Sequence, residues 1–180
     1  SDESSEALLV RAEQAAAKAL GETLVEDLPH IASWREAFSA FGAKPNRTRN
    51  SAEALIRRAS SGLPRINRLT DTYNALSVIH QVPFGGEDLS KYQGAPKLVR
   101  ANGSESFDTT ADGELVAENP EVGEVVWCDD AGVTCRRWNW RQGKRTQLTD
   151  DSTSATIKII DDGNANLYAP NASVSQSVSA

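Results

Sequence analysis

The sequence contains no methionine, and its 180 residues include only two cysteines and two histidines. Without an initiating methionine, we expect that the start residue was removed or that the sequence is part of a longer protein. The cysteines and histidines do not have a spacing typical of zinc ligands, so no metal site is predicted. No apolar run approaches the roughly 18 residues of a membrane span, and the N-terminus lacks a secretory layout. We therefore expect a cytoplasmic protein that does not bind a membrane.

The length and composition fit one folded unit. A chain of 19.4 kDa with 39% hydrophobic residues can bury one sizeable core. The final stretch is polar and has few large apolar residues, so its end is expected to be loose. We predict a single domain over residues 1–165 and a loose C-terminal tail over residues 166–180.

The two cysteines, Cys128 and Cys135, flank a predicted hairpin turn at residues 129–132. They could face each other across two strands, and a disulfide between them is conceivable. In a cytoplasmic protein, however, two reduced and half-buried thiols are the expected state.

The net charge of −6 hides an uneven distribution of charged residues. Segments 44–68 and 136–145 together hold 12 of the 19 lysines and arginines but only one of the 25 acidic residues, Glu53. The rest of the chain carries 7 basic and 24 acidic residues. If the two basic segments meet in space, they would form an anion-binding surface, because guanidinium groups suit phosphate and carboxylate. The alternative is a pair of solvated faces whose charges pair with acidic residues elsewhere.

The first half of the chain has helical periodicity and the second half has short runs of β-branched and aromatic residues between turns. Helices are predicted over residues 4–20, 29–41, 51–60 and 67–81, and a glycine-bearing loop over 82–88. Strands are predicted over residues 97–101, 114–117, 124–128, 133–138 and 156–160. The fold class is therefore α+β, with N-terminal helices packed on a mostly antiparallel sheet.

Several short motifs occur in an order that resembles one known family. They are WREAF at residues 34–38, SAEALIRR at 51–58, LPRIN at 63–67, DTYN at 71–74, PFGGED at 83–88, GEVV at 123–126 and RRWNWR at 136–141. Their order and spacing resemble the B3/B4 domain of the phenylalanyl-tRNA synthetase β subunit, especially its free-standing bacterial members. The resemblance covers roughly residues 30–160 and implies the same α+β fold.

The resemblance also implies a site. In the synthetase, this domain forms a pocket that binds misacylated tyrosine and lets water cleave the aminoacyl ester from tRNA. An aspartate and an asparagine of that pocket carry over to Asp71 and Asn74. The synthetase's pocket histidine falls at about Gly85 and its pocket glutamate near Ile159, so these two groups do not carry over.

The chemistry of such a site is modest, because an aminoacyl ester is already activated. Hydrolysis requires mainly a positioned water and stabilisation of the oxyanion. The candidate catalytic residues are Asn74, Glu87 and Asn139. Glu87 could orient the water or bind an α-ammonium group, although a charged loop residue is often only solvated. For Asp71 we expect a structural role, as a cap or as the partner of an arginine.

The RRWNWR run alternates strictly between two kinds of side chain. In a strand, Arg137, Asn139 and Arg141 would share a polar face, while both tryptophans would share the opposite face. We expect the polar face to point toward the ligand, and the reverse, with tryptophans stacking on a tRNA base, stays open. The candidate substrate-binding residues are Arg49, Gly85, Gly86, Arg137 and Arg141. The candidate tRNA-binding residues are Arg57, Arg58, Lys144 and Arg145.

The leading functional hypothesis is a trans-acting editing hydrolase that deacylates misacylated tRNA, with the acceptor end of an aminoacyl-tRNA as its partner and no cofactor. A second hypothesis is a binding module without catalysis, for tRNA, an amino acid or a nucleotide. A third is an interaction domain whose arginines dock an acidic protein. The sequence has no glycine-rich phosphate motif and no Ser-His-Asp arrangement that would support another enzyme class.

Overall fold

The computed structural model describes residues 1–21 and 23–159, with the helices preceding the strands. The helices are α1 (Glu3–Leu20), α2 (Pro29–Ala40), α3 (Ser51–Arg58) and α4 (Arg68–His80), with 3-10 turns at Val25–Asp27, Ala59–Ser61 and Leu89–Lys91. The strands are β1 (Phe84–Asp88), β2 (Lys97–Arg100), β3 (Phe107–Ala111), β4 (Glu114–Glu118), β5 (Val125–Asp129), β6 (Gly132–Arg136), β7 (Arg141–Gln142) and β8 (Ala155–Ile159). The predicted α+β class is confirmed, while the predicted tail over 166–180 lies outside the described residues.

Side-chain caps fix where three of the helices begin. Asp2 accepts a hydrogen bond from Ser5 N at 2.9 Å at the start of α1. Asn50 and Asn67 do the same for α3 and α4, each accepting from a backbone N–H three residues later at 2.9 Å. Such caps satisfy amide groups that have no partner within the helix. Because Asn50 caps α3, the next residue is free to face the site described below.

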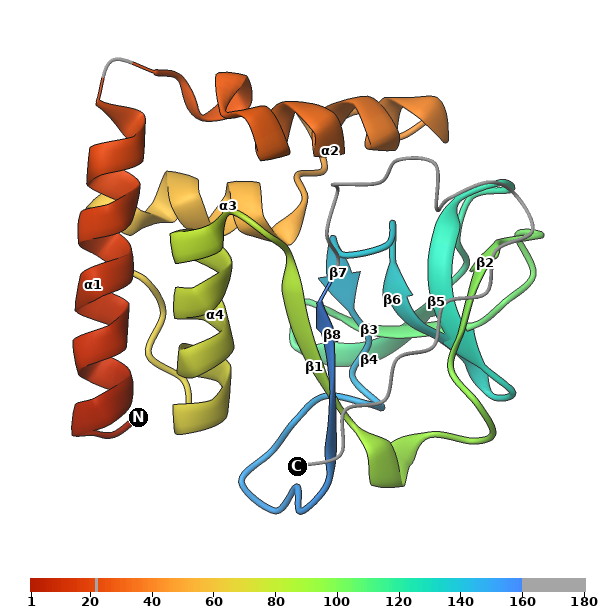
Figure 1. Ribbon diagram of the computed structural model, residues 1–180. Helices are drawn as coiled ribbons and strands as arrows, with labels where there is room; N and C mark the ends of the chain where they lie inside the picture. The colour runs from red at the N-terminus through yellow and green to blue at the C-terminus, as the bar shows by residue number, and fades with distance from the viewer. Residues whose placement is uncertain (22, 160–180) are drawn as a thin grey trace.

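The helices pack against each other and then against the sheet. Helices α1, α3 and α4 share one apolar cluster that includes Leu9, Ile56 and Val78 (Figure 1). Helix α2 links this layer to the strands, because its Trp34 and Phe38 pack with residues of β5 and of the chain after β6. A further cluster around Phe107 lies within the sheet. The aromatic stripe of α2 is therefore part of the core.

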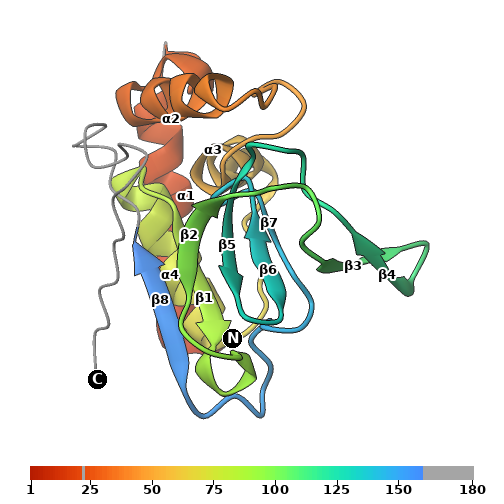
Figure 2. The same ribbon diagram turned by 90° about the vertical axis from the view of Figure 1, so that its right-hand side faces the viewer.

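The strands form two sheets. Strand β1 pairs with β8 in an antiparallel two-stranded sheet, which contacts α4. The larger sheet has the order β2-β5-β6-β3-β4, with β7 paired to β6. All its pairings are antiparallel except the short contact of β3 with β6. Strands β3 and β4 project from the rest of the sheet as a hairpin (Figure 2).

Some strand predictions were wrong. Residues 84–88 were expected to be a loop, because Pro83 precedes them and two of them are glycines. They form β1 instead, through pairing with β8. Strands β3 and β7 were not predicted, and β6 ends at Arg136 instead of Trp138. A pairing partner distant in sequence decides these elements, and local patterns do not contain that information.

The two thiols are both free. A shift of register in the β5–β6 pair places Cys135 opposite Trp127 and Cys128 opposite Val133. The cysteines are therefore not cross-strand partners, and the predicted reduced state agrees with this arrangement. No helix among the described residues is long and apolar enough to span a membrane.

Candidate functional site

A cavity of about 190 Å³ lies where the helices meet both sheets. Its lining comes from five separate parts of the chain, namely the start of α3, the middle of α4, strand β1, the segment 135–142 and strand β8. A second hollow of about 240 Å³ shares Tyr73, Asn74 and Gln142 with the first. Gln142 stands between the two, donating a hydrogen bond to Gly86 O at 2.9 Å. The two hollows are thus neighbouring chambers of one site.

Six of the eight predicted catalytic and substrate-binding residues come together in this cavity. The predicted residues that line it are Asn74, Gly85, Gly86, Glu87, Asn139 and Arg141. Two predicted substrate-binding residues, Arg49 and Arg137, are not part of the lining. Asp71 is fully buried and accepts hydrogen bonds from Ile66 N at 2.8 Å and Ser5 Oγ at 3.4 Å. Asp71 therefore joins α1 to the start of α4, whereas the expected roles were a helix cap, which Asn67 fills for α4, or an arginine partner.

The RRWNWR run is a turn, and the expected alternation in a strand was wrong. Arg136 pairs with Arg141 across β6 and β7, and Arg137 and Trp138 between them have positive φ values of 46° and 67°. The turn is closed by Trp140 N, which donates to Arg136 O at 3.1 Å, and it is joined to β5 by Trp138 N, which donates to Val125 O at 2.7 Å. The chain reverses here, so neighbouring residues no longer alternate between two faces.

This turn separates the two tryptophans. Trp138 is buried and stacks edge-to-face on Trp34, with ring centroids 5.1 Å apart. Trp140 lines the cavity, and the guanidinium groups of Arg136, Arg137 and Arg141 lie within 5.7 Å of its ring centroid. The prediction that the tryptophans pack in the core therefore holds for Trp138 alone.

Two neutral polar groups that line the cavity are buried without a partner. Asn74, which is 8% exposed, lines the cavity beside them. Asn139 accepts a hydrogen bond from Ser51 N at 3.3 Å, but its Nδ2 atom is buried without a partner, as is Ser51 Oγ. Buried polar groups in proteins nearly always have partners, so groups that lack them need an explanation. A polar ligand in the cavity would supply one.

The floor of the cavity is a buried ion pair between β1 and β8. Glu87 is 2% exposed and its carboxylate accepts hydrogen bonds from Tyr92, Thr146 and Lys158. The Lys158 ammonium lies 4.4 Å from the centroid of the Trp127 ring. The alternative, that Glu87 is only a solvated loop residue, is wrong, because Glu87 lies in strand β1 and is buried.

Burial dominates the titration of this floor. It raises the pKa of Tyr92 to about 12 and that of the Cys135 thiol to about 12, so neither ionises near neutral pH. Burial lowers the pKa of Lys158 to about 7, while the adjacent Glu87 carboxylate acts in the opposite direction. Among the described residues, no group of three or more metal-ligating side chains could hold a metal ion.

The two glycines of β1 point to opposite faces. A Cβ atom on Gly86 would lie 2.7 Å from Leu148 Cδ1 and 2.9 Å from Tyr73 Cε1, which are packed side chains. A Cβ atom on Gly85 would meet nothing within 4 Å. In the register of the sheet, Gly85 lies opposite Lys158. The missing side chain at Gly85 therefore leaves the space above the ion pair, and the missing side chain at Gly86 permits close packing of α4.

Many arginines of the basic segments are already held by carboxylates. Arg57 pairs with Glu26 at 2.6 Å and with Glu53 at 2.9 Å. Arg145 makes two bonds of 2.7 and 2.8 Å to Asp129. These two predicted tRNA-binding residues therefore have structural partners, as the alternative reading of the charge pattern anticipated.

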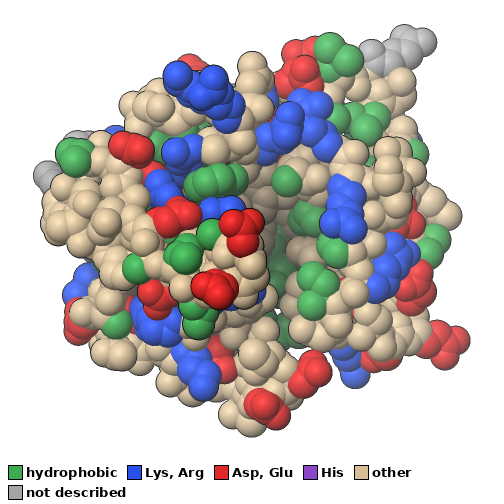
Figure 3. All heavy atoms as spheres, turned by 180° about the vertical axis from the view of Figure 1, so that it is seen from behind, with side chains coloured by type: hydrophobic (Ala, Val, Ile, Leu, Met, Phe, Trp, Pro, Cys, Tyr) green, Lys and Arg blue, Asp and Glu red, His purple; other side chains and the backbone are tan. Residues whose placement is uncertain are grey.

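Other basic groups remain available at the surface. Arg58 and Lys144 are exposed and have no ion pair with any described residue. Arg141 is 44% exposed and lies 3.8 Å from Glu118, a distance too long for a hydrogen bond. The face shown in Figure 3 is hollowed near its centre, and lysine and arginine side chains gather beside the hollow.

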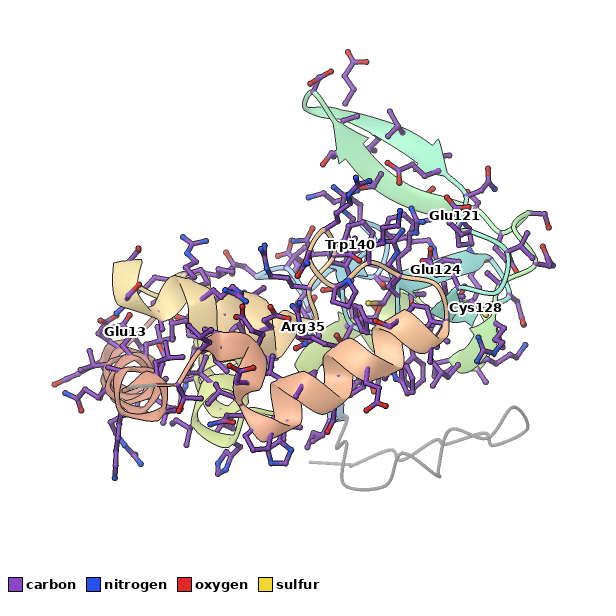
Figure 4. The ribbon with its side chains drawn as sticks, turned by 90° about the horizontal axis from the view of Figure 1, so that it is seen from above. Glu13, Arg35, Glu121, Glu124, Cys128 and Trp140 are labelled. Carbon is purple, nitrogen blue, oxygen red and sulfur yellow. The ribbon has the colours of Figure 1, made fainter. Side chains whose placement is uncertain are left out.

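Glu124 organises the turn next to the cavity. In Figure 4, Glu124 and Trp140 lie between α2 and the projecting β3–β4 hairpin. The Glu124 carboxylate accepts from Arg136 Nε at 2.9 Å, from Arg136 Nη2 at 2.8 Å and from Arg137 N at 3.1 Å. Arg137 Nε lies 3.5 Å from the same carboxylate, and Arg137 is not part of the cavity lining.

Sequence reasoning missed three groups of the site. Lys158 sits on a half-exposed strand, and nothing in its neighbours indicated that its side chain would be buried. Ser51 faces the cavity only because Asn50 takes the capping role. Trp140 was expected in the core. The strict alternation of the RRWNWR run suggested a strand, so no local signal separated Trp140 from Trp138.

Comparison with known proteins gives one family. Residues 33–160 match the sequence pattern of the B3/4 domain, which covers most of the chain and every segment of the cavity. No curated protein and no solved structure gives a significant match. The match agrees with the α+β arrangement of helices and mostly antiparallel sheet. The chain therefore belongs to the B3/4 domain family.

Proposed function

We propose that this protein is a trans-acting hydrolase that deacylates misacylated aminoacyl-tRNA, with the acyl group in the cavity. The observation that carries the proposal is the pair of buried, unpartnered polar groups, Asn139 Nδ2 and Ser51 Oγ, in a cavity of about 190 Å³ that Asn74 also lines. Sites for drug-sized ligands usually measure about 300–1,000 Å³, so this cavity suits a group about as large as one amino acid. Membership of the B3/4 domain family supports the same reading.

The reaction would need only groups that are present. Water adds to the ester carbonyl carbon, the bond to the ribose oxygen breaks, and that oxygen takes the proton released by the water. Asn74 and Asn139 would orient the water and the ester, while the amides of β1 approach closely at Gly85 and Gly86. The Glu87 carboxylate already accepts hydrogen bonds from Tyr92, Thr146 and Lys158. We therefore assign Glu87 an indirect role, through its contact with Lys158. Arg141 would contact the acceptor end at the mouth.

A panel of labelled aminoacyl-tRNAs tests the proposal. We expect deacylation of at least one misacylated tRNA above the spontaneous rate. Asn139→Ala should lower that rate by about 100-fold or more while tRNA affinity stays nearly unchanged, because loss of one oxyanion-site donor typically has this effect. The matched control is Asn119→Ala at the exposed end of β4, which should retain the full rate. A rate in Asn139→Ala equal to that of the wild type would remove Asn139 from the reaction.

One observation favours a binding module without catalysis instead. No histidine lines the cavity among the described residues, the Glu87 carboxylate is occupied, and the Cys135 thiol stays protonated. A protein that binds tRNA but deacylates nothing in the panel would establish this second function.

The basic groups predict how tRNA binding depends on salt. Each phosphate contact releases condensed counterions, so affinity should fall steeply as salt rises. Arg141→Ala should cost about 1.5–3 kcal/mol if Arg141 makes a charge-assisted contact with the RNA. The control is Arg65→Ala, since Arg65 is already paired with Glu6 and Glu13 at 2.7 and 2.6 Å. Equal affinities for both variants across a salt titration would give Arg141 a structural role.

A further inference from the structure

Lys158 is a buried cation on the floor of the cavity. Its side chain is 11% exposed and comes from β8, directly across the strand pair from Gly85. It contacts the Glu87 carboxylate, and the rings of Trp127 and Tyr92 lie at 4.4 and 5.9 Å from Nζ. Lys158 is part of the cavity lining, and Gly85, its partner across the strands, has no side chain to cover it.

Stability alone does not account for this ion pair. Strands β1 and β8 already pair along five residue positions, so the pair is not needed to join them. Taking two charges out of water is costly, and replacing a buried ion pair by apolar residues is often neutral or stabilising by about 1–4 kcal/mol. A lysine kept at the floor of a cavity therefore indicates a ligand.

The cavity offers hydrogen-bond donors in excess of acceptors. An ammonium group has three N–H donors, and Glu87 is the one described acceptor for Lys158. Asn139 Nδ2 is a further buried donor without a partner, and Arg141 adds donors at the mouth. The Glu87 oxygens, in contrast, are occupied by three donors. A ligand that complements this lining presents oxygen acceptors.

We infer that Lys158 binds the acyl oxygen of an amino-acid-sized ligand, so that the cavity accepts α-amino acids and their esters through the carboxylate or carbonyl group. The inference deepens the proposed function and rests on it for the position of the acyl group. In hydrolysis, water addition turns the carbonyl oxygen into an oxyanion. An ammonium group beside that oxygen would bind the transition state more strongly than the ester.

The charges around Lys158 support this role. The titratable and charged groups that face it or share its cavity are Glu87 of β1, Tyr92 after the turn Leu89–Lys91, Cys135 of β6 and Arg141 of β7. Tyr92 and Cys135 stay neutral near pH 7, so Glu87 supplies the negative charge at the floor. A ligand carboxylate would raise the pKa of Lys158 from about 7 and hold the ammonium form. Carboxylate binding should therefore weaken as the pH rises above about 7.

Calorimetric titration with three amino acids, each in three matched forms, tests the inference. The probes are L-leucine, L-phenylalanine and L-tyrosine, the methyl ester of each, and the amino alcohol of each, which lacks the carbonyl oxygen. For at least one side chain, we expect the acid and the ester to bind at least about tenfold more tightly than the alcohol, as loss of one charge-assisted hydrogen bond implies. Equal affinity of all three forms, or no binding by any compound, would overturn the inference.

Two variants locate the effect at Lys158. Lys158→Met should remove the preference for the acid and ester over the alcohol, whereas Lys18→Met, at an exposed lysine of α1, should retain it. Since Lys158→Met leaves Glu87 buried without a counter-ion, the double variant Lys158→Met/Glu87→Gln removes both charges together. A preference that persists in a folded variant lacking Lys158 would contradict the assignment.

The calorimetric titration and the deacylation assay together separate this inference from the proposed hydrolase. A wild-type protein that binds the acid and the ester through Lys158 but deacylates no tRNA leaves the inference standing and removes the hydrolase. A protein that deacylates tRNA at the same rate with and without Lys158 keeps the hydrolase and removes the role of Lys158.

Discussion

Replacing Gly85 by valine should lower the affinity of the cavity for its ligand by about 100-fold or more. The protein should remain at least as stable as before. Gly85 does not have a positive φ, and a Cβ atom there would meet nothing within 4 Å. Valine fits a strand and removes the entropic cost of glycine, which is about 0.5–1 kcal/mol. Its two methyl groups, however, would fill the space above Glu87 and Lys158. Ligand titration together with urea unfolding measures both effects.

Gly86→Val is the matched control on the opposite face of β1. Its Cβ atom would come within 2.7–3.2 Å of the half-buried side chains of Leu148, Tyr73 and Ile157. Overpacking of this kind typically costs about 1–3 kcal/mol. Gly85→Val should therefore lower ligand affinity without lowering stability, whereas Gly86→Val should lower stability. If Gly85→Val retains ligand binding, or if both variants lose the same stability, the cavity is not the binding site or β1 does not have this orientation.

The helical half of the fold could be predicted because its signals are local. Each helix has apolar residues at helical spacing, and Gly42 and Pro83 follow the ends of α2 and α4. Strand β1 could not be predicted in this way. Its Pro-Phe-Gly-Gly sequence is typical of a turn, and it becomes a strand only by pairing with β8, some 70 residues later.

The cavity lining was predicted in part. Asn74 followed from a resemblance of motifs and the Gly85–Gly86 pair from the close backbone approach that glycine permits, and the fold brings both to one cavity. Lys158 could not be found, since its burial depends on β1, Tyr92 and Trp127, which are far from it in the sequence. The charge pattern overstated the free arginines, because buried carboxylates such as Glu53 and Glu124 hold several of them.

Glu124→Gln is expected to cause the largest loss of stability, about 3–5 kcal/mol, because it breaks a buried ion pair by removing one partner. Glu124 is 2% exposed, and Arg136 keeps only the more exposed Glu118 at 3.0 Å as a partner. The matched control is Glu118→Gln, which should cost less than about 1 kcal/mol because that carboxylate is partly solvated. Urea unfolding of the two variants compares them directly.

The ion pair between Glu124 and Arg136 also makes the stability of the protein depend on pH. Burial raises the pKa of Glu124, but the hydrogen bonds and charge of Arg136 outweigh it and hold the pKa below the usual 4.5. The unfolded chain therefore binds this proton at a higher pH than the folded chain does. Stability from Glu124 is complete above about pH 4.5 and is lost as the pH falls through the lowered pKa. In Glu124→Gln, the free energy of unfolding should therefore fall less between neutral pH and pH 3 than it does in the wild type. If the variant and the wild type lose the same stability over this range, other carboxylates, such as Asp129 beside Arg145, dominate the pH dependence.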